Sequence, residues 1–204
     1  LTTGDAHSAG GRYEQAVAEY RAAADLATSE TQVALAHAKV AYVYAMHLQN
    51  YSEARSAAET ALAKQSAAPV ARVIALQTLA ECQFEDEMRL DAAIATLEEA
   101  RGLQGVGWAQ PGVAMKLGDL YRESGRFDEA EESYQAVLSM GPADDAMRAV
   151  ANLNLGITHQ YGLQDELQAI EFYNAALELK PDLEAEVAAH KSKMLIVEQP
   201  SDSQ

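Results

Sequence analysis

The sequence predicts an all-α protein, a right-handed α-solenoid in which antiparallel helix pairs follow one another along the chain. Four observations support this fold class. Apolar residues recur at helical spacing, and small residues recur at a long and nearly constant interval. Hydrophobic residues make up 49 % of the 204 residues but aromatic residues only 6 %, because much of the apolar content is alanine, the strongest helix former. Few β-branched runs are left to form a sheet.

The long interval is marked by one small residue in the second helix of each pair. These residues are Ala16, Ala54, Ala93, Ala130 and Ala169. Their successive separations, by subtraction, are 38, 39, 37 and 39. The matching small residues of the first helices are Gly4, Ala41, Ala80, Gly118 and Gly156. The chain therefore contains about five units, of which the first is truncated because only a short segment precedes Gly11.

The fourth unit, Met115 to Pro142, shows the pattern most clearly. Its two helices carry one apolar face each, made of Leu117, Gly118, Tyr121, Ala130, Tyr134, Val137 and Leu138. Gly125 lies between the helices, where a residue that accepts positive φ can end the first helix. Pro142 stops the second helix.

This unit resembles a tetratricopeptide repeat, because a Leu-Gly pair, Tyr, Gly, an aromatic residue, Ala, an aromatic residue and a closing Pro follow in the order of that family. The usual repeat has about 34 residues, so the present units are a few residues longer. One extra residue lies between the helices of units two, three and five. The remaining excess, about one helical turn, precedes each first helix and would keep the apolar stripe in phase.

The other units begin and end at recognisable signals. In the first unit, the second helix is clear from Tyr13 onward, and the second unit starts at Ser29, which forms a capping-box signature with Gln32. Pro69 opens the third unit, as prolines often do in a first helical turn. A glycine-rich connection, residues 102–112, leads to the fourth unit, and Pro181 closes the fifth.

The array is expected to occupy residues 1–182, followed by one further amphipathic helix over residues 183–197. A solenoid needs a cap over its last apolar face, and this helix is placed to supply it. Residues 198–204 are expected to form a flexible tail.

The resemblance implies a binding surface, since the first helices of successive tetratricopeptide repeats line a concave groove that holds peptides. The residues facing it would be those six and three positions before the small residue and those one and four after it. The predicted groove residues are Leu35, Tyr42, Ile74, Gln77, Glu81, Phe84, Met115, Asp119, Arg122, Leu153, Ile157 and Gln160. Two alternatives are that neighbouring helices bury some of these residues, or that the C-terminal helix folds back into the groove.

The chemistry of this surface suggests the kind of partner. Tetratricopeptide repeats that bind acidic C-terminal tails carry Lys three residues before the small residue and Asn just after it. No unit of this chain has that pair. The surface is mainly apolar, with Glu81 and Asp119 near its middle. We therefore expect an amphipathic helix or apolar peptide with some Lys or Arg.

The charge balance excludes other partners. The chain has 15 basic and 31 acidic residues, a formal net charge of −16. Such a surface repels phosphate backbones and anionic lipid, so neither nucleic-acid binding nor direct membrane binding is expected. The same charge would also keep an alanine-rich protein in solution without any role in binding.

No pattern in the sequence indicates catalysis. Phosphate-binding, zinc-protease, serine-hydrolase and EF-hand motifs are all missing, and one cysteine, Cys82, cannot form a paired-cysteine metal site. We expect no enzyme activity, no cofactor and no metal. Three histidines, His7, His37 and His159, are expected to pack between helices, and two, His47 and His190, to lie on the surface.

The leading functional hypothesis is a non-catalytic interaction module, a scaffold or adaptor that docks a partner segment. A ligand- or peptide-sensing domain of a larger regulator or signalling protein is the first alternative. The second is a self-assembling scaffold, a homo-oligomer formed through the terminal units, for which a surface around Tyr13 and Tyr20 is the candidate. The sequence contains neither a signal peptide nor a membrane span, so we expect a cytoplasmic location. The chain starts at Leu1, however, and a targeting signal could precede it.

Overall fold

The computed structural model describes residues 1–86 and 88–197, and every regular element in these ranges is a helix. The all-α prediction is confirmed. The chain divides into two compact units, Leu1–Gly107 and a second that begins at Trp108. The division falls inside the glycine-rich connection at residues 102–112. The expected tail, residues 198–204, lies outside the described residues.

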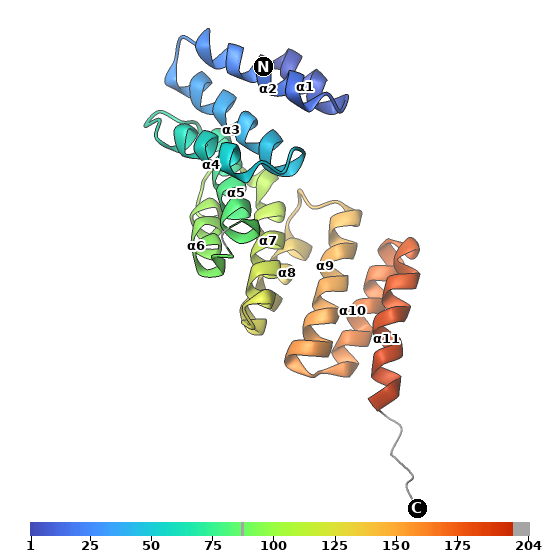
Figure 1. Cartoon of the computed structure of the whole chain (residues 1–204). Coiled ribbons are helices and arrows are strands. Elements are labelled where there is room, and N and C mark those ends of the chain that lie inside the picture. The colour runs from blue at the N-terminus through green and yellow to red at the C-terminus, as the bar shows by residue number, and fades with distance from the viewer. Residues whose placement is uncertain (87, 198–204) are drawn as a thin grey trace, which may run out of the picture. The chain divides into compact units, whose positions relative to one another are not determined.

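The first unit consists of three antiparallel helix pairs (Figure 1). The pairs are α1 (Thr2–Ala9) with α2 (Tyr13–Asp25), α3 (Glu30–Met46) with α4 (Tyr51–Leu62), and α5 (Pro69–Glu85) with α6 (Leu90–Arg101). The predicted helix starts are confirmed, because the Ser29 hydroxyl accepts a hydrogen bond from the Gln32 backbone N–H at 3.3 Å and Pro69 opens α5.

The second unit contains two further pairs and a C-terminal helix (Figure 1). After the short 3-10 turn η1 (Gly107–Ala109), its elements are α7 (Gln110–Glu123), α8 (Phe127–Ser139), α9 (Asp145–Thr158), the π-helix η2 (His159–Leu163), α10 (Glu166–Leu179), the 3-10 turn η3 (Pro181–Leu183) and α11 (Glu184–Val197). Asp144 caps α9 by accepting a hydrogen bond from the Met147 backbone N–H at 2.8 Å.

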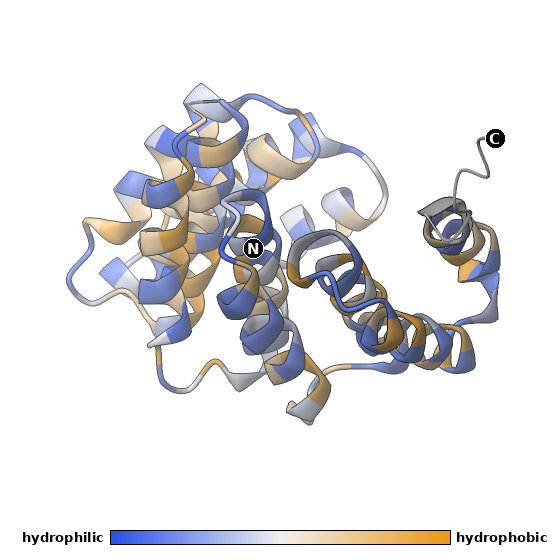
Figure 2. Ribbon diagram, turned by 90° about the horizontal axis from the view of Figure 1, so that it is seen from below, coloured by the Kyte–Doolittle hydropathy of each residue, from blue (hydrophilic) through white to orange (hydrophobic). Residues whose placement is uncertain are grey.

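Each unit has its own apolar core, formed where the amphipathic helices meet; Figure 2 shows hydrophilic and hydrophobic residues on different sides of the same helices. In the first unit the core is built largely from alanines and valines of α2, α3 and α4, with Tyr20 as its large residue. In the second unit α11 adds Val187 and Met194 to the core around Tyr173. The C-terminal helix therefore caps the last pair.

The small residues of the first helices come in two kinds, and the packing explains the difference. Where the residue is Gly4, Gly118 or Gly156, the facing residue is Tyr20, Tyr134 or Tyr173, respectively. A Cβ atom on any of these glycines would lie 2.4 to 2.5 Å from the tyrosine ring. Where the small residue is alanine, the residue four after the second-helix marker is instead Ala58 or Leu97. Glycine is thus needed wherever a tyrosine ring contacts the first helix at this position.

The turns within the pairs account for the extra residue of units two, three and five. Every turn has one residue with positive φ, five positions before the second-helix marker: Gly11, Gln49, Met88, Gly125 or Gln164. With glycine there, the next backbone N–H bonds the carbonyl five residues back, as in Arg126 to Tyr121. In the three turns without glycine at this position, the corresponding N–H bonds the carbonyl six residues back, as in Asp165 to His159. In unit five, the wider turn continues the π-helix η2.

Two expectations about single residues need correction, and a third is confirmed. Tyr20 is only 3 % exposed, because α1 covers it, so it does not lie on a free surface available for self-assembly. His190 is half-buried rather than on the surface, and its ring stacks on Tyr173 with centroids 5.9 Å apart. His159 is buried, as expected, with its Nε2 atom 3.3 Å from the carboxylate of Glu131.

Candidate functional site

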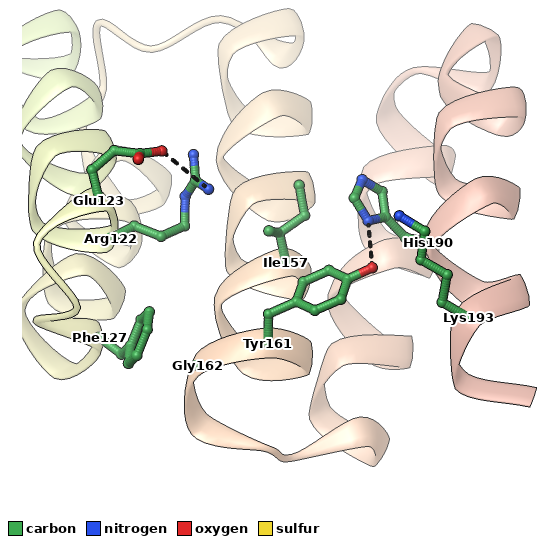
Figure 3. Close-up of a pocket in the computed structure, with 8 residues that line it drawn as sticks. All are labelled: Arg122, Glu123, Phe127, Ile157, Tyr161, Gly162, His190 and Lys193. Carbon is green, nitrogen blue, oxygen red and sulfur yellow. Dashed lines mark hydrogen bonds and ion pairs between the residues drawn. The ribbon is translucent and has the colours of Figure 1, made fainter. Parts of the chain in front are cut away.

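The second unit contains a cavity of about 400 Å³ at the end of its first helices (Figure 3). The lining residues come from α7, α8, α9, η2 and α11. They are Arg122, Glu123, Phe127, Ile157, Tyr161, Gly162, His190 and Lys193. Two of them, Arg122 and Ile157, belong to the predicted groove. The cavity is of the size of small-ligand or side-chain pockets.

Arg122 is held in place on α7 by its neighbours. Its Nε atom donates a hydrogen bond of 3.5 Å to the hydroxyl of Tyr134 on α8, and its guanidinium lies 3.8 Å from the carboxylate of Glu123. Both contacts are long. The guanidinium therefore keeps donors for another acceptor in the cavity.

Aromatic and aliphatic side chains form the apolar part of the cavity. Phe127 begins α8 and packs on Gly162, where a Cβ atom would lie 2.4 Å from the ring. Glycine at 162 therefore allows η2 to approach α8 closely. Ile157 contacts the core of the second unit on one side, and Tyr161 is 48 % exposed beside it.

The C-terminal helix supplies the remaining polar side chains. His190 and Lys193 are three residues apart on α11 and share a face. The hydroxyl of Tyr161 and Nδ1 of His190 are 3.3 Å apart, and Nζ of Lys193 lies 5.9 Å from the centre of the Tyr161 ring. The helix predicted as a cap thus also forms one wall of the cavity, without filling it (Figure 3).

The other predicted residues of the second unit are engaged within the fold. One carboxylate oxygen of Asp119 accepts hydrogen bonds from the Tyr134 hydroxyl at 2.7 Å and from the Asn154 side-chain amide at 3.1 Å. The same amide lies 3.9 Å from the sulfur of Met115. Burial raises the pKa of the Asp119 carboxyl above its ordinary value, although the Tyr134 hydrogen bond and the charge of Arg122 act in the opposite direction.

Leu153 and Gln160 are also directed inward. Leu153 is only 4 % exposed and packs in the core with Val187 and Met194 of α11. Gln160 accepts a hydrogen bond from the Tyr173 hydroxyl at 2.7 Å and donates one to the backbone carbonyl of His190 at 3.0 Å. Their side chains therefore contribute to the packing of α9, η2 and α11.

The six predicted residues of the first unit lie on α3 and α5. Leu35 and Ile74 are half-buried against the core of that unit. Gln77, Glu81 and Phe84 are half-buried along α5, and Tyr42 on α3 is 45 % exposed. The rings of Tyr42 and His47 form a T-shaped pair with a centroid distance of 5.7 Å. A role for these residues in binding stays a prediction.

Sequence reasoning missed Tyr161, and the π-helix explains why. Counting four residues on from Gly156 along a regular α-helix selects Gln160 for the groove. The wider π turn shifts the side chains that follow, so Gln160 turns toward α10 and Tyr161 lines the cavity. The one extra residue between the helices of unit five is the feature of the sequence that could have indicated this wider turn. His190 and Lys193 were missed because they belong to the capping helix.

Comparison with known proteins agrees with the repeat assignment. Residues 112–182 match the sequence model of the tetratricopeptide repeat. These residues are tetratricopeptide repeats. The assignment made from the fourth unit is confirmed, and the matched segment includes six of the eight residues that line the cavity. No curated protein matches the chain.

Solved structures of tetratricopeptide-repeat proteins share the fold of the chain. A structure of MamA is 22 % identical, with a TM-score of 0.66, and the match covers 88 % of this chain and 95 % of that one. YrrB, described as a tetratricopeptide-repeat protein with an unusual peptide-binding site, is 23 % identical with a TM-score of 0.66 over 95 % of this chain and 90 % of its own. A thermophilic tetratricopeptide-repeat protein of Thermus thermophilus is 20 % identical with a TM-score of 0.65 over 93 % of this chain and 96 % of its own.

Within residues 1–86 and 88–197, no group of three or more His, Cys, Asp or Glu side chains is arranged to hold a metal ion, and no helix combines the length and apolar character needed to cross a membrane. Burial raises the pKa of the Cys82 thiol to about 11, so this cysteine is a poor nucleophile at neutral pH.

Proposed function

We propose that this protein is a non-catalytic interaction module that docks a segment of a partner protein in the cavity of its second unit. The observation that carries the proposal is the cavity itself, which combines exposed aromatic surface with Arg122 and Ile157 of the predicted groove. Rigid helices hold its walls, which lowers the entropy cost of binding. The tetratricopeptide fold supports this role, and YrrB offers a structural neighbour described as having a peptide-binding site.

Panning a library of random peptides displayed on phage against the whole chain tests the proposal. Enriched peptides should compete with one another and lose binding to the Ile157→Glu variant, which places a charge in the apolar wall. The Leu167→Glu variant is the matched control, because Leu167 is 79 % exposed on α10 and is not among the residues that line the cavity. It should bind the peptides like the unaltered chain.

Ile157 also contacts the core, so a second variant separates lost binding from lost folding. Tyr161→Ala removes an exposed ring and should weaken binding while leaving the helical circular dichroism unchanged. Failure to enrich any peptide, or retained binding by both cavity variants, would refute the proposal. If the chain instead self-associates, and Ile157→Glu but not Leu167→Glu abolishes the association, the occupant is a second copy rather than a partner peptide.

A further inference from the structure

The charges around the cavity are opposite in sign to those of the unit that contains it. From Trp108 onward the sequence has 17 acidic residues and 7 basic ones. Yet the cavity is lined by two of those bases, Arg122 and Lys193, by His190, and by one acid, Glu123. A cationic pocket on an acidic unit concentrates attraction for an anion at one place.

The basic groups of the pocket are incompletely paired. Arg122 contacts the carboxylate of Glu123, but the distance between the guanidinium nitrogen and the carboxylate oxygen is 3.8 Å. Among the described residues, Lys193 has no carboxylate within salt-bridge distance, and its ammonium group lies near the face of Tyr161. By contrast Lys191, two residues earlier on α11, donates a hydrogen bond of 2.7 Å to the Asn174 side chain. Lys193 and Arg122 are therefore the groups able to receive an outside carboxylate.

We propose that the cavity binds an acidic side chain of a partner peptide, with Arg122 and Lys193 receiving the carboxylate and with Phe127 and Tyr161 contacting an adjacent apolar side chain. This refines the proposed function by stating the chemistry of the partner segment, and it rests on that proposal. It replaces, for this unit, the expected basic partner, because the Asp119 carboxylate that suggested one is bonded to Tyr134 and Asn154.

His190 links such binding to pH. Burial lowers the pKa of His190, and the positive charges of Lys193 and Arg122 lower it further. The negative charge of Glu186 on α11 acts in the opposite direction. The ring is otherwise faced by the hydroxyl-bearing rings of Tyr161 and Tyr173. A bound carboxylate would offset the two cations and raise the pKa of His190. A ligand that raises the pKa of a group binds more tightly when that group is protonated. Affinity should therefore increase as pH falls through the range in which His190 becomes protonated.

Two capped peptides provide the test: acetyl-Ala-Glu-Phe-Ala-amide and its Gln analogue, titrated into the isotopically labelled chain and followed by NMR. The Glu peptide should bind about tenfold more tightly, as expected for charge-assisted hydrogen bonds. It should also raise the pKa of His190, and the Gln peptide should not. Lys193→Gln should remove most of the Glu preference, whereas Lys191→Gln, the matched control on the same helix, should keep it.

Equal affinities for the two peptides, no binding of either, or equal effects of Lys193→Gln and Lys191→Gln would overturn the proposal of an anion site. Because Lys193 is exposed, its substitution should not impair folding, which the amide spectrum would show. The phage panning distinguishes failure of the anion site from failure of the proposed function. Enriched peptides that depend on Ile157 and Tyr161 but carry no acidic residue would support the proposed function and reject the anion site.

Discussion

Gly118 and Tyr134 act as one packing unit, since the ring lies where a side chain at position 118 would extend. Ala at 118 would gain about 1 kcal/mol of helix propensity but would place its Cβ atom 2.5 Å from the ring. We expect Gly118→Ala to lower the free energy of unfolding by about 1–3 kcal/mol, measured by chemical denaturation.

The third unit suggests the control for this prediction. There the small residue is Ala80 and the facing position is Leu97, so adding Tyr134→Leu should recover part of the stability lost in Gly118→Ala. A double variant whose destabilisation equals or exceeds the sum of the single effects would show that the two residues do not pack as a pair.

Gly125 has a different requirement, which is conformational. Its φ of +74° lies in the left-handed region, and nothing would contact a Cβ atom there within 4 Å. Gly125→Ala should therefore lower the free energy of unfolding by about 1 kcal/mol through backbone strain alone. Gly141→Ala is the control, because Gly141 also has open space around it but not a positive φ. Equal effects of the two substitutions on the denaturation midpoint would contradict this explanation.

At the scale of the elements, Asp119 joins three helices, because its oxygen accepts from Tyr134 of α8 and Asn154 of α9. Its folded pKa is raised above the ordinary value, so the native state holds the proton more tightly than the unfolded chain. This site then makes the protein less stable as pH rises from about 4 through the folded pKa.

The Asp119→Asn variant tests whether Asp119 lowers the stability of the protein as pH rises. An asparagine oxygen can accept the same two hydrogen bonds without a charge to bury. The stability of the variant relative to the unaltered chain should therefore increase as pH rises from about 3.5 to about 7, measured by urea unfolding at several pH values. The opposite slope would show that the hydrogen bonds and the charge of Arg122 outweigh the cost of burying the carboxylate.

At the scale of the whole molecule, a repeat protein distributes its stability among neighbouring elements. Gly118→Ala should therefore accelerate amide hydrogen exchange in α7 to α10 much more than in α1 to α4, which belong to the other compact unit. Mass-spectrometric exchange of the unaltered chain and the variant would measure this. Uniform acceleration across the chain would show a single cooperative unit instead.

The order of the helices, the 37- to 39-residue period and the small positions where helices cross could all be predicted from the sequence. These features depend on local geometry: residues three and four apart share a helix face, and capping residues such as Ser29 and Asp144 act on backbone groups a few positions away. The same local rule selected Arg122 and Ile157, which line the cavity, because both lie on regular helix.

Only the tertiary structure decided which side chains of that face remain available. Asp119 and Gln160 have the right spacing but bond across to neighbouring helices. Each residue adds about 100° of rotation in a regular helix, so the wider π turn at 159–163 brings Tyr161 into the place predicted for Gln160. Lys193 belongs to a helix outside the repeats. Hydrogen-bond partners and the packing of a distant helix do not follow from periodicity, because they depend on contacts between residues far apart in the chain.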